Sequence, residues 1–472
     1  FAYGFTVAGC TPDDYPVAVD ASSATPFAGT AEAYDSNGNL GISFNLAEDN
    51  CNLFMYASTL GEKRELNNII SVAAVSLGDF TLPVIDTRAE TQNLYVVLNN
   101  LGSNPVTSVD YAYSFDGDNF VTGKAETNIE PASENYFVIP ASTSVTGRGE
   151  LTVRINSVND VEYGSVTKLP YIAIDNDGYH RNFVVEEGTG TGCGYCPRGI
   201  VGMESMAEAY PETFIGIAVH GDWFGSDPMT VASYQPLLEY YFTGFPSCIV
   251  NRDPIFIVDP SKEYLQTVYE FWASQAGAAE IGLNVIKPDE NASAIDVVAT
   301  TTFAYDDADA KYALAFVIIE DGLKGIQTNY FAGQPGAMGG WGSKPQRVTW
   351  TYSDTARDIF DVWGIGGSVP SSVEKATAYD YKYSLKMKNV KNIENTSVVA
   401  MLIDNETGVI INAKKVAYAD YSDPNGITDI NTDATAPAEY YNIQGVRMDA
   451  DNLPAGLYII RQGDKVQKTI IR

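Results

Sequence analysis

The stretch Val185-Glu-Glu-Gly-Thr-Gly-Thr-Gly-Cys-Gly-Tyr-Cys-Pro-Arg-Gly199 carries a C-x-x-C pair between two segments of different periodicity. The residues before the pair, 182–187, begin with an apolar run of the kind that forms a strand. After the pair, apolar residues between 200 and 210 recur at helical spacing. Cys193 and Cys196 are therefore expected at the start of a helix, where the helix dipole favours a thiolate.

The segments that follow the pair continue an alternation of strands and helices. Residues 213–219 form an apolar run typical of a buried parallel strand, and 230–242 and 262–276 have helical patterns. Pro246 opens another apolar run between these two helices. This order is thioredoxin-like: a strand, a C-x-x-C pair, a helix, a second strand, a second helix, and then a proline that leads into a hairpin. We place this domain at residues 178–278.

A redox site of this type predicts a role for each of five residues. Cys193 is expected to be exposed near the N-cap as the nucleophile, and Cys196 to be shielded as the resolving thiol. Pro246 is expected to face the pair after a cis peptide bond. Glu187 is the candidate buried acid that moves the proton of the second thiol. Arg198 would add positive charge near the thiolate.

Other interpretations of the same residues remain open. Cys193, Cys196, Cys248 and His220 would make a Cys₃His zinc set, although the second two residues lack close ligand spacing. Cys248 is otherwise a buried strand residue or a third redox thiol. His220 ends an apolar strand, which favours a structural role or a place at the substrate edge. Glu187 is either the buried acid or a solvated carboxylate at the end of a strand.

Two further cysteines lie far upstream, at Cys10 and Cys51. In an oxidising compartment they would form a disulfide that closes a loop of about 40 residues. The alternatives are two buried thiols, or lipidation of Cys10, since Val7-Ala-Gly-Cys10 resembles a lipobox.

The composition excludes several classes of function. Lys and Arg total 29 and Asp and Glu total 60 in 472 residues, which gives a net charge of −31. Such a chain repels phosphate backbones and anionic lipid headgroups, so we expect no nucleic-acid partner. No run of about 20 apolar residues occurs, so no membrane-spanning helix is expected. An acidic chain rich in Tyr, Asn and β patterns fits an extracytoplasmic setting.

Most of the remaining chain has short alternating strands separated by Gly, Asn and Asp turns, so the fold class is multidomain and β-rich. Residues 322–378 have no regular pattern, and the aromatic, Gly-rich loop 322–352 lies within them. The expected parts are a β-rich N-terminal region (1–77), an immunoglobulin-like sandwich (78–177), the thioredoxin-like domain (178–278), another β-sandwich (279–420), a linker (421–438) and a small β-sandwich (439–472).

The motif at 185–199 resembles the signature of the outer-membrane protein 28 family, and the resemblance extends over about 180–420. Members are extracytoplasmic bacterial proteins with a thioredoxin-like core and a following β domain. The resemblance implies Cys193 as nucleophile and Cys196 as resolving thiol. The chain departs from the family at two positions. Gly188 stands where the family usually has an aromatic residue, and Gly192 stands where a Trp often precedes the first Cys.

The C-terminal segment 441–472 is similar to the sorting domains of type IX secretion. This similarity implies passage through the outer membrane by the secretion machinery, followed by attachment at the surface or release. The alternative is a small β unit that only caps the chain.

These observations predict a secreted or cell-surface thiol–disulfide oxidoreductase that acts on thiols and disulfides of proteins or peptides. No cofactor and no metal are expected. The alternative is a non-catalytic surface binding or adhesion protein that keeps the thioredoxin fold as a scaffold. Its contact site would be the loop 322–352.

Overall fold

The computed structural model describes residues 68–273 and 275–423 continuously, together with strands on either side at 18–20, 30–34, 40–45, 52–54, 438–442, 447–448, 456–462 and 465–471. The chain divides into two compact units, residues 1–66 and 67–472. In the first unit, β1 (Ala18–Asp20) pairs with β4 (Asn52–Phe54), and β2 (Thr30–Tyr34) with β3 (Leu40–Asn45). Cys10 and Cys51 lie outside the described residues, so their predicted pairing stays a prediction.

Two antiparallel sheets enclose the first core of the second unit. One sheet has the order β10-β7-β5 and the other β6-β12-β11-β8-β9, with β6 and β12 parallel. Alternate residues of β7 point inward, because Leu94, Val96 and Leu98 are fully buried. The first strand, β5, begins before residue 78, the expected start of this part. The strands are β5 (Ile70–Leu77), β6 (Val84–Asp86), β7 (Gln92–Asn100), β8 (Val106–Ser114), β9 (Val121–Ile129), β10 (Ser133–Ala141), β11 (Gly147–Val158) and β12 (Val161–Ile174).

The second unit also contains an eight-stranded mixed sheet with the order β16-β15-β13-β14-β22-β19-β24-β25. It joins segments 178–278 and 279–420 in one sheet, because β14 pairs with β22 through Ala218 and Thr355. Strands β13, β19 and β24 are buried along their whole length, as expected for strands covered on both faces. The strands are β13 (Phe183–Thr189), β14 (Phe214–His220), β15 (Ser247–Val250), β16 (Ile257–Val258), β19 (Tyr312–Glu320), β22 (Thr355–Ile365), β24 (Thr396–Asp404) and β25 (Ile410–Ala417).

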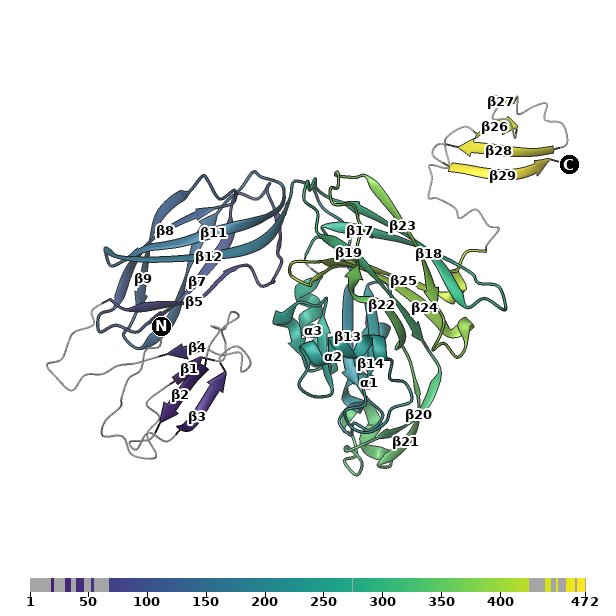
Figure 1. Cartoon of the computed structure of the whole chain (residues 1–472), viewed down its shortest axis with the longest axis horizontal. Helices are drawn as coiled ribbons and strands as arrows, with labels where there is room; N and C mark the ends of the chain where they lie inside the picture. The colour runs from purple at the N-terminus through teal and green to yellow at the C-terminus, as the bar shows by residue number, and fades with distance from the viewer. Residues whose placement is uncertain are drawn as a thin grey trace. The chain divides into compact units, whose positions relative to one another are not determined.

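Three helices lie around β13 and β14: α1 (Pro197–Ala209), α2 (Gln235–Tyr241) and α3 (Lys262–Trp272) (Figure 1). Successive residues of β13 contribute to different cores. Val185 packs with residues of α1 and α3, whereas Val184 belongs to a cluster with residues of α2 and the two paired cysteines. No helix among the described residues has both the length and the apolar character needed to cross a membrane.

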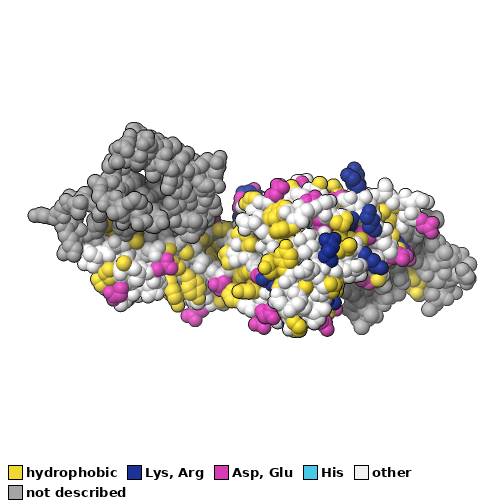
Figure 2. Space-filling model, turned by 90° about the horizontal axis from the view of Figure 1, so that it is seen from below, with side chains coloured by type: hydrophobic (Ala, Val, Ile, Leu, Met, Phe, Trp, Pro, Cys, Tyr) yellow, Lys and Arg dark blue, Asp and Glu magenta, His cyan; other side chains and the backbone are white. Residues whose placement is uncertain are grey.

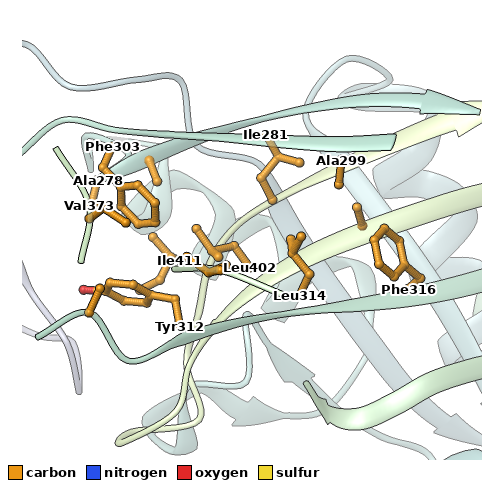
Figure 3. Packing of buried hydrophobic residues seen from close by; sticks show 14 of the residues in the cluster. Ala278, Ile281, Ala299, Phe303, Tyr312, Leu314, Phe316, Val373, Leu402 and Ile411 are labelled. Atoms are coloured by element: carbon orange, nitrogen blue, oxygen red, sulfur yellow. The ribbon is translucent and has the colours of Figure 1, made fainter. Parts of the chain in front are cut away.

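A three-stranded sheet of order β17-β18-β23 packs against the half of the large sheet that contains β19, β24 and β25. Figure 3 shows this core, in which Ile281 and Phe303 face Leu314, Leu402 and Ile411. The strands are β17 (Ala279–Ile286), β18 (Ala294–Phe303) and β23 (Ala378–Lys386). The sequence prediction of a β-rich fold is thereby confirmed.

Residues 322–378 are not irregular as expected, because they contain β20 (Leu323–Thr328), β21 (Arg347–Tyr352) and β22. The pairing of β22 with β19 shifts register twice, and Asp361 has a positive φ of 56°. These irregularities interrupt the two-residue alternation from which a strand is predicted. Strands β20 and β21 form a hairpin that holds residues 329–346 between them.

Near the C-terminus, the described strands form one antiparallel sheet of order β27-β26-β28-β29. A β unit is present as predicted, but its described strands make a single sheet and not the expected sandwich. The strands are β26 (Ala438–Asn442), β27 (Arg447–Met448), β28 (Gly456–Gln462) and β29 (Lys465–Ile471).

Candidate functional site

Cys193 and Cys196 are joined by a disulfide with their Cα atoms 5.4 Å apart. They occupy a turn before α1, which begins at Pro197 with Cys196 as its N-cap. Cys193 therefore lies three residues before the N-cap, near the start of the helix. Pro197 suits the first helical position, because its missing N–H would have no partner inside the helix.

The expectation that Cys193 is exposed is wrong. Cys193 has 2% of its surface exposed and Cys196 has 0%, so both sulfurs lie in the protein interior. Cys193 remains the less shielded of the two by this small margin. A segment distant in sequence is hydrogen-bonded to the loop that carries the pair, and we call residues 327–331 the cover segment.

The cover segment binds the backbone around the cysteine pair. Its Thr328 N–H donates to Thr191 O at 2.8 Å, and its Tyr330 N–H donates to Gly194 O at 2.9 Å. The Gln327 side-chain Nε2 donates to Cys193 O at 2.7 Å, and Tyr352 OH donates in turn to Gln327 Oε1 at 2.8 Å.

The ring of Tyr330 fills the space above Gly194, where a Cβ atom would overlap the ring. An amino acid with a larger side chain at position 194 would therefore displace Tyr330. The hairpin β20–β21 thus closes over the pair.

Exposed aromatic side chains surround the covered pair. Tyr195 and Tyr330 are 53% and 58% exposed, with ring centroids 5.2 Å apart. Trp223 stacks on Phe245 at 4.3 Å, and its neighbour Phe224 is 51% exposed. Large exposed aromatic groups of this kind are typical of interaction surfaces. On the face drawn in Figure 2, hydrophobic side chains are visible in several places and Lys and Arg gather in one part of the described surface.

Glu187 is buried, which decides between the two interpretations of this carboxylate. It is 2% exposed, and its Oε1 has no hydrogen-bond partner among the described residues. Burial raises the pKa of Glu187 to about 8, the charge of Asp259 adds to this rise, and a hydrogen bond with Thr189 opposes it. Its Oε1 lies against Gly199, whose N–H donates to Cys196 O at 3.0 Å. The carboxyl group therefore lies at the first turn of the helix that Cys196 caps.

Arg198 pairs with an acid instead of turning toward the cysteines. Its Nη1 lies 3.1 Å from Asp259 Oδ2, and both side chains are about one-third exposed or less. The positive charge expected near Cys193 is thus largely compensated. The N–H groups of Arg198 and Gly199 donate to the carbonyls of Tyr195 and Cys196.

Pro246 is buried, and the Phe245–Pro246 peptide bond is cis, as predicted. The rings of Phe242 and Phe245 occupy the space beside Gly188, 2.8 Å from where a Cβ would lie. At Gly192, the carbonyl oxygen of Phe224 occupies the space where a Cβ would lie. Glycine at both positions therefore has a steric reason, because aromatic rings fill the space at Gly188 and the backbone of Phe224 fills it at Gly192.

The residues of the zinc alternative are not brought together. Among the described residues, no three His, Cys, Asp or Glu side chains lie close enough to hold a metal ion. Cys248 is a fully buried thiol on β15, opposite Glu187 in the register. His220 is also buried, and its Nδ1 lies 2.9 Å from Asp227 Oδ2, which accepts from Thr191 N at 2.6 Å. Through Asp227, His220 is therefore connected to the loop that precedes Cys193, which fits a structural role for His220.

The sequence pattern gave no sign of the cover segment as a part of this site. It identified the aromatic loop 322–352 as a possible contact surface, but not its hydrogen bonds to residues 191–194. A buried ion pair of Arg252 with Glu186 was also missed. The only available signals were the isolated Arg252 beside an apolar strand and the unusual length of the loop.

Replacing Tyr330 with alanine should increase the rate at which dithiothreitol reduces the Cys193–Cys196 disulfide. An aromatic contact contributes about 0.5–1.5 kcal/mol, so we expect a roughly 2- to 10-fold faster reaction. Thiol release measured with a chromogenic reagent would give the rate. Tyr264→Ala, at an exposed position on α3, is the matched control and should react like the wild type. An unchanged rate in Tyr330→Ala would show that the cover does not limit access.

Residues 235–421 match the family model described as outer membrane protein Omp28. The chain carries an Omp28 family domain. The matched region begins after Cys196, so the cysteine pair lies outside the part of the chain that the Omp28 match covers. No curated protein sequence matches the chain.

Three solved structures show partial similarity. HBP35 of Porphyromonas gingivalis has 18% identity and a TM-score of 0.38, covering 63% of this chain and all of that chain. A protein from Agrobacterium tumefaciens has 12% identity and a TM-score of 0.31, covering 55% and 100%. A domain of the outer membrane lipoprotein Omp28 from Porphyromonas gingivalis has 13% identity and a TM-score of 0.17, covering 31% and 90%.

Proposed function

We propose that this protein is an extracytoplasmic thiol–disulfide oxidoreductase of thioredoxin type that exchanges disulfides with proteins or peptides. The observation that carries the proposal is the Cys193–Cys196 disulfide at the start of α1, with the buried carboxyl group of Glu187 at the first helical turn. In this proposal, the segment around β13, β14 and the three helices is the thioredoxin-like part, and the sandwiches are immunoglobulin-like modules.

The exchange has two balanced steps. A Cys193 thiolate attacks a substrate disulfide, forms a mixed disulfide and releases one substrate thiolate, which takes a proton from water. Cys196 gives its proton to Glu187 and attacks the Cys193 sulfur, which releases the second substrate thiolate. The substrate gains two electrons and the cysteine pair loses them. In the reverse direction, a dithiol reduces the pair and Glu187, with a pKa of about 8, donates its proton to the departing Cys196 thiolate.

The test is the reduction of a fluorogenic peptide disulfide by the protein after its own disulfide has been reduced. We expect activity in the wild type, no activity in Cys193→Ser, and a trapped mixed disulfide with the peptide in Cys196→Ser. Cys248→Ser is the matched control and should retain activity, because Cys248 is fully buried on β15. Equal activity of Cys193→Ser and the wild type would refute the proposal.

The non-catalytic binding function is the second candidate, and the burial of both sulfurs favours it. In this case the exposed Tyr195, Phe224 and Tyr330 would contact a partner while the disulfide only holds the turn. The two candidates differ in the peptide assay. A scaffold protein would fail to reduce the peptide after complete reduction of its own pair, whereas an oxidoreductase would turn it over.

For localisation we propose the outer membrane or cell surface, or release from it. The name of the matched family supports the outer membrane, and the C-terminal sheet at 438–471 is the proposed contact with the secretion machinery. Truncation after residue 430 should leave the thermal unfolding of the core unchanged but abolish export. Normal export of the truncated protein, measured by fractionation, would contradict the sorting role.

A further inference from the structure

A cavity of about 320 Å³ lies beside α3, lined by two segments of the chain. One segment precedes and enters β13, and the other is the end of α3 with the residues after it. Its walls are about half polar, and their aromatic and apolar part consists of Tyr179, Phe183, Tyr269, Trp272, Ala273 and Ala276. Neither cysteine of the redox pair lines it, so the cavity is separate from the site described above.

Arg181 brings a buried positive charge into this cavity. Its guanidinium carbon lies 3.9 Å from the centre of the Trp272 ring. Its Nε and Nη1 are inaccessible to solvent and have no hydrogen-bond partner among the described residues. The indole Nε1 of Trp272 is likewise buried without an acceptor. Two lining residues therefore hold three buried nitrogen donors that nothing in the described structure satisfies.

Unsatisfied buried donors are costly, at about 1–3 kcal/mol for each group, and more for a charged one. Burial also lowers the pKa of Arg181, although the charge of Asp253 opposes this effect. The carboxylates nearby already have other partners. Asp177 lines the cavity but lies 2.9 Å from Arg88, and Asp253 accepts hydrogen bonds from Thr81. The missing partner is therefore an acceptor, and the guanidinium charge calls for an anion.

We propose that this cavity binds a small carboxylate with an apolar body, its carboxylate on Arg181 and its body against the aromatic walls. A guanidinium binds a carboxylate with charge-assisted hydrogen bonds, and the Trp272 N–H is a further donor. The volume is at the lower end of the range of about 300–1,000 Å³ that is usual for small-molecule sites. The aromatic side chains in the lining, Tyr179, Phe183, Tyr269 and Trp272, favour an acid with an apolar body over a free inorganic anion, which would gain nothing from contact with these rings.

The experiment is calorimetric titration of the full chain with benzoate, with benzamide as the neutral analogue and inorganic phosphate as the anion without an apolar body. We expect saturable binding of benzoate with a Kd of about 1 mM or tighter, and weaker binding of the other two probes. Arg181→Met should weaken benzoate binding about 10- to 100-fold, and Trp272→Phe by a smaller factor. Arg181→Lys keeps the charge and should retain part of the affinity.

The matched control is Arg154→Met, which removes another arginine that lies over an aromatic ring, at 3.8 Å from Phe120 but outside the cavity. It should bind benzoate like the wild type. Absence of saturable benzoate binding to the wild type would overturn the proposal. Equal binding of benzamide would overturn the inference that the charge of the ligand matters. Tighter binding of phosphate would overturn the inference that the ligand has an apolar body. Because these outcomes use the wild type, they hold even if a variant fails to fold.

Discussion

Glu187→Gln should make the protein more stable than the wild type at pH 8 and nearly equal to it at pH 5. The pKa of the buried carboxyl is raised from 4.5 to about 8, so between these values the folded state holds a proton that the unfolded state has lost. Stability from this group is fully present below the unfolded pKa and is lost as pH rises through the folded pKa. Glutamine has a similar shape and cannot ionise, so the variant lacks this loss.

The size of the effect follows from the linkage between proton binding and folding. Stability of the wild type should fall by about 1.4 kcal/mol per pH unit between about 4.5 and 8, a total on the order of 5 kcal/mol. Urea unfolding of the oxidised protein at several pH values would measure it. Glu212→Gln, at an exposed position before β14, should keep the pH dependence of the wild type. Parallel pH profiles for the wild type and Glu187→Gln would show that Glu187 is not protonated in the folded protein.

Arg252→Ala should destabilise the protein by about 3–5 kcal/mol, because it leaves an uncompensated buried charge on Glu186. The Arg252 Nε and Nη2 atoms each lie 2.7 Å from an oxygen of Glu186, and both side chains are fully buried. Tyr234 OH donates to the same carboxylate at 2.6 Å, and Arg252 Nη1 donates to Val362 O. The ion pair and its hydrogen bonds thereby link four parts of the chain: β13, the turn after β15, the residue that precedes α2, and β22.

Chemical denaturation would measure this loss. The double variant Glu186→Leu with Arg252→Met should lose less than Arg252→Ala alone, since it removes both charges together. Arg88→Ala, which breaks an ion pair on the surface, should leave the midpoint of unfolding nearly unchanged. If Arg252→Ala and Arg88→Ala unfold at the same denaturant concentration, the buried ion pair does not stabilise the fold.

Local patterns were enough to predict the parts of the site that are close in sequence. The apolar run before Cys193, the proline after Cys196 and the helical spacing beyond it depend on backbone geometry and side-chain periodicity, which neighbouring residues determine. The strand, the helix and the cysteine pair at its start were therefore expected and are present. The helix begins at Pro197, a residue that favours the first helical position.

The sequence by itself determined the β-rich class, the cysteine pair before a helix and the cis bond at Pro246. Only the tertiary structure decided that Glu187 is buried, that Tyr330 covers the pair and that Arg181 faces a cavity without a partner. The physical reason is the range of the interactions. Burial, pKa and access depend on groups that are distant in sequence, such as Asp259 for Glu187, Trp272 for Arg181 and Gln327 for Cys193, and no local pattern records such pairings.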